Sequence, residues 1–444
     1  MNRTTMTRNI LRTAPLMTVL FLMACGDIFT VKNPGSIQDD DLNSAEGVNA
    51  LVVGMSADFS VIMDELAFLV GRAGDEMAGS GSYNNTGLFR RGIVAKEDVN
   101  FYWSAAHRAR WVAEDGVRRM KEDIPEYSFD NNPLTARAFL LAGLSNRMMG
   151  ESFCNAVFST DSTHGAVEPA SAHFDRAIPY LNDAITHATG AGIDTLVTAA
   201  HGVLAQVYVG KGDWTNAVAH SAMVPDDFLY EAIYSSNSGR EYNVLYGETH
   251  LRSEMSAFST LAASFPEYDQ PGADPRAPWT NCTRILQDSI DAGAAPADPS
   301  CTVHQGADGV TANYQQMKFL DRGAEIPVIK GAEMRLIEAE AALQGAGNLP
   351  AFTTSINEAR AIYSMPPVTQ PATLADAWDL LDQERHLTLW LEGRRMFDLN
   401  RWDHDFLNGG SVVYPGEARR ASCIPISNTE CQVNDVIRGD AVCS

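Results

Sequence analysis

Apolar residues recur at helical spacing through much of the chain, most clearly between residues 135 and 224. One stripe follows the i, i+3, i+4, i+7 pattern that places apolar side chains on a single helix face. Its members are Phe174, Ala177, Ile178, Leu181, Ala184 and Ile185. Pro179 falls within this stripe and predicts a local kink, because proline cannot donate the backbone hydrogen bond of a helix interior. Two longer helices are expected over residues 44–66 and 100–123, so the pattern predicts a mainly α protein.

The predicted helices come in pairs. Residues 200–209 are small and apolar, residues 210–213 read Gly-Lys-Gly-Asp, and Trp214 begins the partner helix. A further pair is expected at residues 334–343 and 356–363. Helix pairs that recur at roughly 30 to 34 residues, with small residues at the contact, are typical of tetratricopeptide repeats. The sequence therefore predicts a helical-repeat scaffold.

Two segments break the helical pattern. Residues 71–85 are rich in glycine and polar side chains, which predicts a connecting loop outside the core, where binding groups are often placed. Residues 226–325 are rich in Tyr, Ser, Asn, Pro and Gly and contain no long apolar stripe. We expect them to form an irregular insertion in the scaffold.

The N-terminal residues have the layout of a secretory signal. Three arginines precede a short apolar run that ends at Cys25. The run has roughly ten residues, fewer than the about 20 that a membrane-spanning helix needs. Its end resembles a bacterial lipobox, so we expect residues 1–24 to be removed, Cys25 to be acylated and residues 25–43 to act as a tether. An ordinary signal peptide cut nearby is the alternative.

Composition narrows the function classes. The chain has 444 residues, of which 45% are hydrophobic and 20% charged, and a formal net charge of -23. These proportions are typical of a globular protein and not of a disordered or multi-span membrane protein. A strongly acidic protein repels the phosphate backbone, so no nucleic-acid partner is expected.

Seven cysteines are present, and six remain if Cys25 is lipidated. An even set in an exported chain favours disulfides. The candidates are Cys282, Cys301, Cys423, Cys431 and Cys443. We expect one bridge between the first two, which bracket a polar segment, and one among the last three. Cys154 ends an apolar helix and is interpreted as a buried free thiol. No pair has zinc or redox spacing, so no metal or cofactor is expected.

The most distinctive block is residues 384–402, where an apolar helix end runs into arginines, acids and aromatic residues. This block resembles the C-terminal signature of the SusD/RagB family of nutrient-uptake lipoproteins. Other blocks resemble the same family in the same order: the lipobox, the Trp103 helix, residues 204–217, Asp274-Pro275-Arg276, residues 326–341 and Ile424-Pro425-Ile426. Together they extend over nearly the whole chain.

The resemblance implies a mainly α fold, in which a tetratricopeptide-like scaffold carries an irregular, loop-rich lobe that binds the ligand. It implies one SusD-like domain over residues 44–444, with the scaffold at approximately 100–225 and 326–402, the insertion at approximately 226–325 and a disulfide-stapled segment at 403–444. It also implies a non-catalytic lipoprotein on the surface of the bacterial outer membrane. Such a protein captures oligosaccharide, or peptide in some members, for a SusC-like TonB-dependent transporter.

Candidate ligand-binding residues follow from the chemistry of sugar recognition. Sugars are bound by flat aromatic faces beside carboxylate, amide or guanidinium groups. The glycine-rich segment and the surroundings of Trp279 offer this combination, and the insertion adds further tyrosines. The candidates are Asp75, Glu76, Tyr83, Asn84, Asn85, Tyr242, Tyr246, Arg276 and Trp279. For each of them, packing within a loop is the alternative.

Two polar groupings are interpreted as structural. Trp103, His107 and Arg110 fall on one helix face, but a core tryptophan beside a histidine is commoner than a polar site there. The charged residues of the 384–402 block look like an acid/base cluster. Ion pairs fit them better, because arginine stays protonated and its fork matches carboxylates.

No enzyme class is favoured. The motifs of lipase-like hydrolases, zincins and P-loop proteins are absent. With 56 acidic residues, the sequence neither identifies nor excludes the carboxylate pair of a glycoside hydrolase. We therefore expect a binding protein. The alternatives are a helical-repeat scaffold for an envelope protein complex, since paired helices form concave protein-binding surfaces, and a secreted glycosidase.

Overall fold

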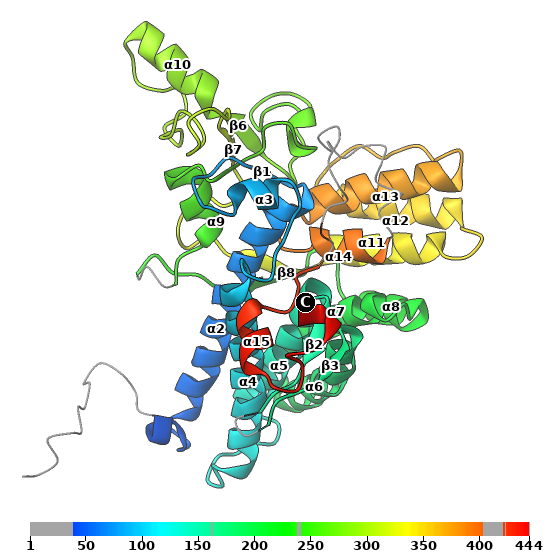
Figure 1. Ribbon diagram of the computed structural model, residues 1–444. Coiled ribbons are helices and arrows are strands. Elements are labelled where there is room, and N and C mark those ends of the chain that lie inside the picture. The colour runs from blue at the N-terminus through cyan, green and yellow to red at the C-terminus, as the bar shows by residue number, and fades with distance from the viewer. Residues whose placement is uncertain (1–38, 161–162, 238–240, 403–420, 422, 444) are drawn as a thin grey trace, which may run out of the picture.

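The computed structural model describes residues 39–160, 163–237, 241–402, 421 and 423–443. Within these ranges the protein is mainly helical (Figure 1). One large hydrophobic core extends from the first long helix to the C-terminal segment. None of the helices in these ranges is long and apolar enough to cross a membrane. The predicted lipidation site, Cys25, lies outside the described residues.

Two long helices, α2 (Val48–Gly74) and α4 (Asn100–Glu122), pack against each other. In Figure 1, α2 runs upward through the molecule and reaches the upper lobe. A Cβ atom at Gly116 would lie 1.8 Å from Met55 Cε, so the missing side chain lets α4 approach α2 closely.

The glycine-rich segment differs from its prediction. Helix α2 continues to Gly74, and residues 71–80 are buried except for the half-buried Asp75. A Cβ atom at Gly71 would lie 3.1 Å from a methyl carbon of Leu391, which shows how tightly this segment packs on the C-terminal block. The expectation of a loop outside the core is therefore wrong for residues 71–80, because glycine here permits close packing.

Helix pairs build the remaining scaffold, as the repeat pattern predicts. The pairs are α5 (Pro133–Ser152) with α6 (Ser171–Ala191), α7 (Asp194–Gly210) with α8 (Trp214–Ser221), and α11 (Gly331–Leu343) with α12 (Leu349–Ile362), followed by α13 (Leu374–Thr388). Side-chain caps set several of the helix starts. Asn132 Oδ1 accepts from Leu134 N at 3.0 Å, and Asp213 Oδ1 accepts from Asn216 N at 3.1 Å. Pro179 lies inside α6.

The insertion forms the irregular lobe at the top of Figure 1. Among the described residues, strands pair only as two-stranded antiparallel sheets. These are β1 (Ala78–Gly79) with β5 (Met255–Ser256), β2 (Asn155–Val157) with β3 (Val167–Pro169), β4 (Leu229–Ala232) with β8 (Ile326–Lys330), and β6 (Trp279–Asn281) with β7 (Tyr314–Gln316). Short helices are α3 (Thr86–Arg90), α9 (Val244–Tyr246) and α10 (Cys282–Ala292). Because β4 pairs with β8, the two ends of the insertion meet and the helical scaffold resumes beside the point where it stopped.

Disulfides close the insertion and the C-terminal segment. The bridges Cys282–Cys301 and Cys431–Cys443 agree with the pairings expected. The interpretation of Cys154 as a free thiol is wrong, because it is bonded to Cys423, 269 residues further along the chain. Sequence spacing could not reveal this pairing, since folding alone brings the end of α5 beside the C-terminal segment.

The charged C-terminal block forms buried ion pairs, as expected. Arg385 donates to both carboxylate oxygens of Asp398 at 3.0 Å. Arg394, just before α14 (Arg395–Arg401), bonds Glu151 of α5 at 3.0 Å and Glu333 of α11 at 2.7 Å. These contacts tie the block to two separate helix pairs of the scaffold.

Candidate functional site

An open cleft lies beside the N-terminal half of α4, and we call it the α4 cleft. Its volume of about 630 Å³ is in the range of small-ligand sites. Its walls come from α4, from the segment after β2 and from the start of α15 (Asn428–Val433). The lining residues are Asn100, Phe101, Trp103, Ser104, His107, Arg108, Arg110, Trp111, Val157, Ser159, Thr160, Ser427, Thr429 and Glu430.

An exposed stripe of α4 contributes to this cleft. Phe101, Ser104, Arg108 and Trp111 recur at i, i+3, i+7 and i+10, and all four are exposed. The Phe101 side chain is 51% exposed and Trp111 is 41% exposed. At 1.5 Å per residue, about 15 Å of helix separates the two residues. The cleft is therefore lined by two solvent-accessible aromatic rings.

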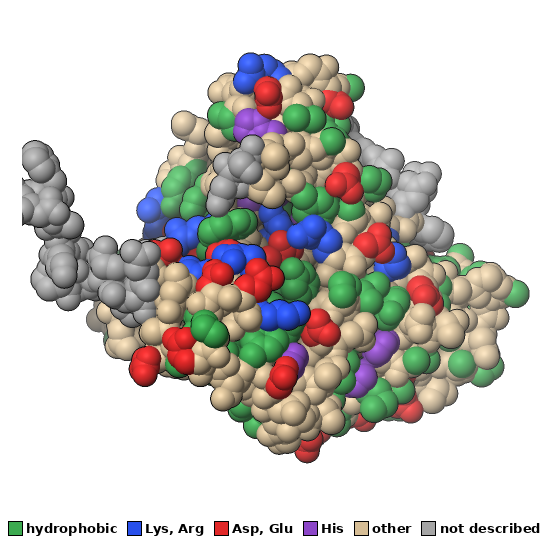
Figure 2. Space-filling view, turned by 90° about the horizontal axis from the view of Figure 1, so that it is seen from below, with side chains coloured by type: hydrophobic (Ala, Val, Ile, Leu, Met, Phe, Trp, Pro, Cys, Tyr) green, Lys and Arg blue, Asp and Glu red, His purple; other side chains and the backbone are tan. Residues whose placement is uncertain are grey.

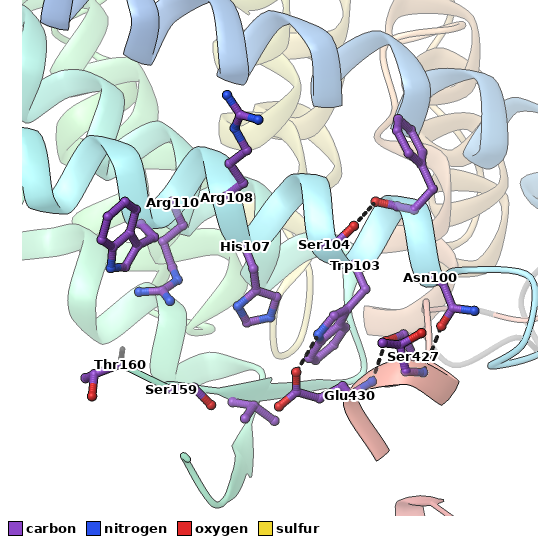
Figure 3. A pocket seen from close by; sticks show the side chains of 14 residues that line it. Asn100, Trp103, Ser104, His107, Arg108, Arg110, Ser159, Thr160, Ser427 and Glu430 are labelled. Atoms are coloured by element: carbon purple, nitrogen blue, oxygen red, sulfur yellow. Dashed lines mark hydrogen bonds between the residues drawn. The ribbon is translucent and has the colours of Figure 1, made fainter. Parts of the chain in front are cut away.

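Trp103, His107 and Arg110 project from α4 toward α15 and the segment after β2 (Figure 3). Trp103 is buried, as expected, and its indole Nε1 donates to Glu430 Oε2 at 3.4 Å. The centroids of the Trp103 and His107 rings are 4.4 Å apart. The predicted core tryptophan therefore also forms part of the cleft wall.

His107 supplies an uncharged polar group. Burial, aided by the nearby Arg110 charge, lowers the pKa of His107 to about 3, so the imidazole is neutral at physiological pH. Its Nε2 is buried and has no hydrogen-bond partner among the described residues. Arg110 is paired with Glu114 at 2.6 Å. A neutral imidazole such as that of His107 suits the hydroxyl groups of a ligand better than a charged group.

The α15 wall is held in place by contacts from distant parts of the chain. Thr429 N donates to Asn100 Oδ1 at 2.9 Å, and Lys96 Nζ donates to Cys443 O at 2.6 Å. The two C-terminal disulfides tie this segment to the end of α5 and close it upon itself. A covalent framework thus fixes the position of α15 relative to α4.

Two of the predicted site residues, Asp75 and Glu76, turn into the protein. Asp75 Oδ1 accepts from Arg395 Nε at 2.8 Å, and Glu76 Oε1 accepts from Leu391 N at 2.8 Å. Burial raises the pKa of Glu76 to about 8. Neither residue lines the α4 cleft. These contacts explain why the segment that contains Asp75 and Glu76 is buried and not exposed to solvent.

Tyr83 and Asn84 are exposed and Asn85 is half-buried, so this part of the predicted cluster remains on the surface. The Tyr83 hydroxyl donates to Glu248 Oε2 at 3.1 Å, and the guanidinium carbon of Arg252 lies 4.9 Å from its ring centroid. These residues do not line the α4 cleft. The structure therefore does not bring them together with the exposed rings of α4.

The second predicted cluster, around Trp279, is buried. Trp279 is 7% exposed, and its ring centroid lies 4.7 Å from that of Tyr314 in a stacked arrangement. Arg276 donates to Asp274 at 2.7 Å and also pairs with Glu384. These contacts agree with the alternative given for both residues, which is packing within the protein, because neither side chain has a face open to solvent.

The two remaining candidates, Tyr242 and Tyr246, do not line the α4 cleft either. The Tyr246 ring stacks on His250, with centroids 4.9 Å apart. Tyr242 is half-buried and lines a different hollow, which it shares with α2 and α4.

Phe101, Trp111 and Glu430 are cleft residues that the sequence reasoning missed. The i, i+10 spacing of Phe101 and Trp111 on a predicted helix could have indicated a shared face, because it places both rings away from the helix face that carries the buried Trp103. Glu430 had no signal, since Trp103 and Glu430 are 327 residues apart. In the part of the chain that the structure describes, no group of three or more His, Cys, Asp or Glu side chains is placed to hold a metal ion.

Solved structures with the same fold are SusD-like proteins. A SusD/RagB family protein from Bacteroides thetaiotaomicron matches with a TM-score of 0.63 and 15% identity, covering 89% of this chain and 95% of that one. A SusD-like protein from Bacteroides fragilis has a TM-score of 0.63 and 14% identity, covering 83% and 88%. A laminarin-binding SusD-like protein has a TM-score of 0.56 and 18% identity, covering 86% and 97%. At such identities the likeness shows the fold.

A model of the SusD family matches residues 303–435 of this chain. The matched part includes the 384–402 block and α15, which forms one wall of the α4 cleft. No curated protein sequence matches the chain. The family match and the fold together confirm the resemblance to the SusD/RagB family and the predicted mainly α, repeat-based architecture.

Proposed function

We propose that this protein binds a neutral oligosaccharide in the α4 cleft, without altering it, and delivers it to a SusC-like TonB-dependent transporter. The observation that carries the proposal is that two exposed rings, Phe101 and Trp111, share one cleft with amide, hydroxyl and neutral imidazole groups, although charged side chains also line it. Aromatic faces stack on the apolar faces of sugars, and polar groups orient the hydroxyls. The about 15 Å of helix between the residues that carry the rings is longer than one sugar unit, which favours an oligosaccharide.

Other findings support a role in nutrient uptake. The family match links the chain to SusD proteins, and a protein with the same fold is described as laminarin-binding. Cleavage before Cys25 and acylation of its thiol would anchor the protein to the outer membrane at the cell surface. On the face shown in Figure 2, acidic and basic side chains are interspersed with hydrophobic ones. This mixture differs from the continuous basic surface that nucleic-acid binding uses.

The chemistry of the α4 cleft favours binding over hydrolysis. Of the described residues that line it, Glu430 is the only acid. Glycoside hydrolases generally use two carboxylates placed on either side of the scissile bond. The volume of the α4 cleft, about 630 Å³, is in the range of small-ligand sites and favours a small ligand over the alternative role of a scaffold for protein complexes.

Replacing Trp111 with alanine tests the proposal. The 41% exposure of Trp111, applied to a side-chain area of about 250 Å², leaves about 100 Å² for contact. A sugar that covers half of this area gains about 1.3 kcal/mol at about 25 cal/mol per Å². We therefore expect an about tenfold loss of affinity, measured by calorimetry with the best ligand from a glycan array.

Tyr83→Ala is the matched control, because Tyr83 is an exposed aromatic residue outside the α4 cleft. It should leave the affinity unchanged. Loss of binding in Tyr83→Ala but not in Trp111→Ala would move the site to the glycine-rich segment. A protein that binds no glycan and copurifies with no TonB-dependent channel would contradict the proposed function as a whole.

A further inference from the structure

A second hollow of about 600 Å³ lies between α2, the start of α4 and residues 233–244, and we call it the acidic pocket. Among the described residues of the two linings, it shares only Phe101 and Arg108 with the α4 cleft. Arg108 points away from α4 in the opposite direction from His107 (Figure 3). The lining residues are Val53, Ser56, Ala57, Asp58, Ser60, Val61, Asp64, Glu65, Phe101, Ala105, Arg108, Arg137, Ile233, Tyr234, Ser235, Glu241, Tyr242 and Val244.

The walls of the acidic pocket are largely apolar and open to solvent. Val53 is 53% exposed and Ile233 is 56% exposed, and both line it. Ala57 on α2 is also exposed. An apolar hollow with a few polar groups is the usual form of a small-ligand site.

A buried carboxylate with a free oxygen lines this pocket. Asp64 is 2% exposed, and its Oδ2 accepts from Val244 N at 2.8 Å. Its Oδ1 has no hydrogen-bond partner among the described residues. A buried polar atom without a partner carries a desolvation cost that a ligand donor would remove. Glu65, the next residue of α2, lines the same pocket.

The two arginines that line the pocket bond other residues of its lining, and among the described residues Arg137 forms no ion pair with an acid. Arg108 donates to Asp58 Oδ2 at 3.1 Å, and Arg137 donates to Ser56 Oγ at 3.1 Å. Among the described residues, no lysine or arginine forms an ion pair with Asp64 or Glu65. The two neighbouring acids therefore line the pocket without an ion-pair partner among the described residues, although the more distant Arg72 charge acts on Glu65.

We propose that the acidic pocket binds a primary ammonium group carried on an apolar stem, with the ammonium at Asp64 and Glu65 and the stem along Val53, Ala57 and Ile233. An ammonium donates three hydrogen bonds and accepts none, which matches unpartnered carboxylate oxygens. This inference does not depend on the proposed glycan site, because it uses a separate hollow.

The proposal has a consequence for pH. Burial raises the pKa of Asp64 well above its ordinary value despite the Val244 N–H, with the neighbouring Glu65 adding to the rise. Burial and Glu248 raise the pKa of Glu65 to about 7, although Arg72 opposes this shift. The phenol of Tyr234 also lies near Asp64. A bound cation favours the ionised carboxylates, so binding releases protons and the affinity rises with pH.

The test uses n-hexylamine as the cationic probe and hexan-1-ol as its neutral counterpart, measured by calorimetry on the full chain. With one proton released from a group of pKa about 7, hexylamine should bind about tenfold more tightly at pH 8 than at pH 6. Hexanol should bind more weakly and without pH dependence. Equal binding of the two probes, or no binding of hexylamine, would overturn the proposal.

Two substitutions and a control locate the site. Asp64→Asn should weaken hexylamine binding at least tenfold, and Ala57→Phe, which fills the mouth from an exposed position, should abolish it. The exposed Asp227 lies outside the pocket, so Asp227→Asn should change nothing. Asp64 also accepts a hydrogen bond from Val244 N, so Asp64→Asn could fold poorly. Ala57→Phe does not disturb this bond and therefore still tests the site. Unchanged affinity in Ala57→Phe would refute the assignment.

A short acetylated and amidated peptide, Ala-Lys-Ala, distinguishes free amines from a lysine side chain as the source of the ammonium. Displacement of hexylamine by this peptide, but not by Ala-Ala-Ala, would support the site and show that it admits lysine within a chain. Displacement by both peptides alike would contradict recognition of the charge.

Discussion

Replacing Arg394 with methionine should strongly destabilise the protein, because it removes the cation shared by Glu151 and Glu333. The Arg394 side chain is 5% exposed and its two partners are 3% and 2% exposed. After the change, Glu151 keeps its ion pair with Arg147 at 2.8 Å. Glu333 keeps the hydrogen bond from the neutral Gln206 at 2.7 Å, and Arg385 and Arg147 act on it without forming an ion pair among the described residues. Removing one partner of a buried ion pair costs about 3–5 kcal/mol, since a charge is left buried without compensation.

The size of this effect should depend on pH. Burial opposes the charge of Glu333, but Arg394 and Arg385 outweigh it and lower the pKa of Glu333 below its ordinary value. In the wild type, the resulting stability is present above the ordinary pKa and is lost as pH falls through the lowered value. Without Arg394, burial is opposed by Arg385 and Arg147 alone among the charges that lower the pKa of Glu333, so we expect this pKa to be higher in the variant than in the wild type. The penalty is then full at pH 8 and smaller at pH 5, where Glu333 can take up a proton.

Urea unfolding at pH 8 and pH 5, followed by tryptophan fluorescence, measures the effect. Arg284→Met is the surface control, because Arg284 is 52% exposed and pairs with Glu267 at 3.0 Å. Exposed pairs contribute about 0–1 kcal/mol. Adding Glu333→Gln to Arg394→Met removes the stranded charge and should restore part of the lost stability. If Arg394→Met and Arg284→Met unfold alike at both pH values, the reasoning about buried charge is refuted.

Two further predictions concern the C-terminal disulfide and a tightly packed glycine. Replacing both Cys154 and Cys423 with serine should cost about 2–4 kcal/mol and loosen α15, so acrylamide should quench tryptophan fluorescence more strongly; unchanged quenching and melting would contradict this. Gly331→Ala should lower the free energy of unfolding by about 1–3 kcal/mol more than Gly116→Ala. The new Cβ at residue 331 would lie 2.3 Å from a backbone oxygen, whereas the new Cβ at residue 116 would meet the flexible end of a methionine. Equal unfolding midpoints for the two variants would contradict this prediction, because they would show that the backbone near residue 331 moves to accommodate the methyl group.

Much of the fold could be predicted from local patterns. The stripe that begins at Phe174 becomes α6, and the Gly-Lys-Gly-Asp turn separates α7 from α8. Such elements follow from the period of the apolar positions, which is a property of neighbouring residues. The 384–402 block carried the family resemblance, and its arginines form the buried ion pairs expected of them.

The candidate site was predicted less well, because exposure is decided by contacts between distant residues. Trp279 and Arg276 have the chemistry of a sugar site, yet Tyr314 and Glu384 cover them. Phe101 has an ordinary place in a helix pattern, yet it stays exposed beside a cleft. Residue type alone does not distinguish an aromatic side chain that is buried from one that is exposed to solvent.

The amino-acid sequence by itself determined the helix pairs and the disulfide between Cys282 and Cys301, because each depends on residues close together in the chain. Only the tertiary structure decided that Cys154 is bonded to Cys423, that α15 forms one wall of the α4 cleft and that Asp64 lines the acidic pocket. The physical reason is that burial and pairing energies depend on which surfaces meet. In this protein the surfaces that form the cleft come from segments more than 300 residues apart.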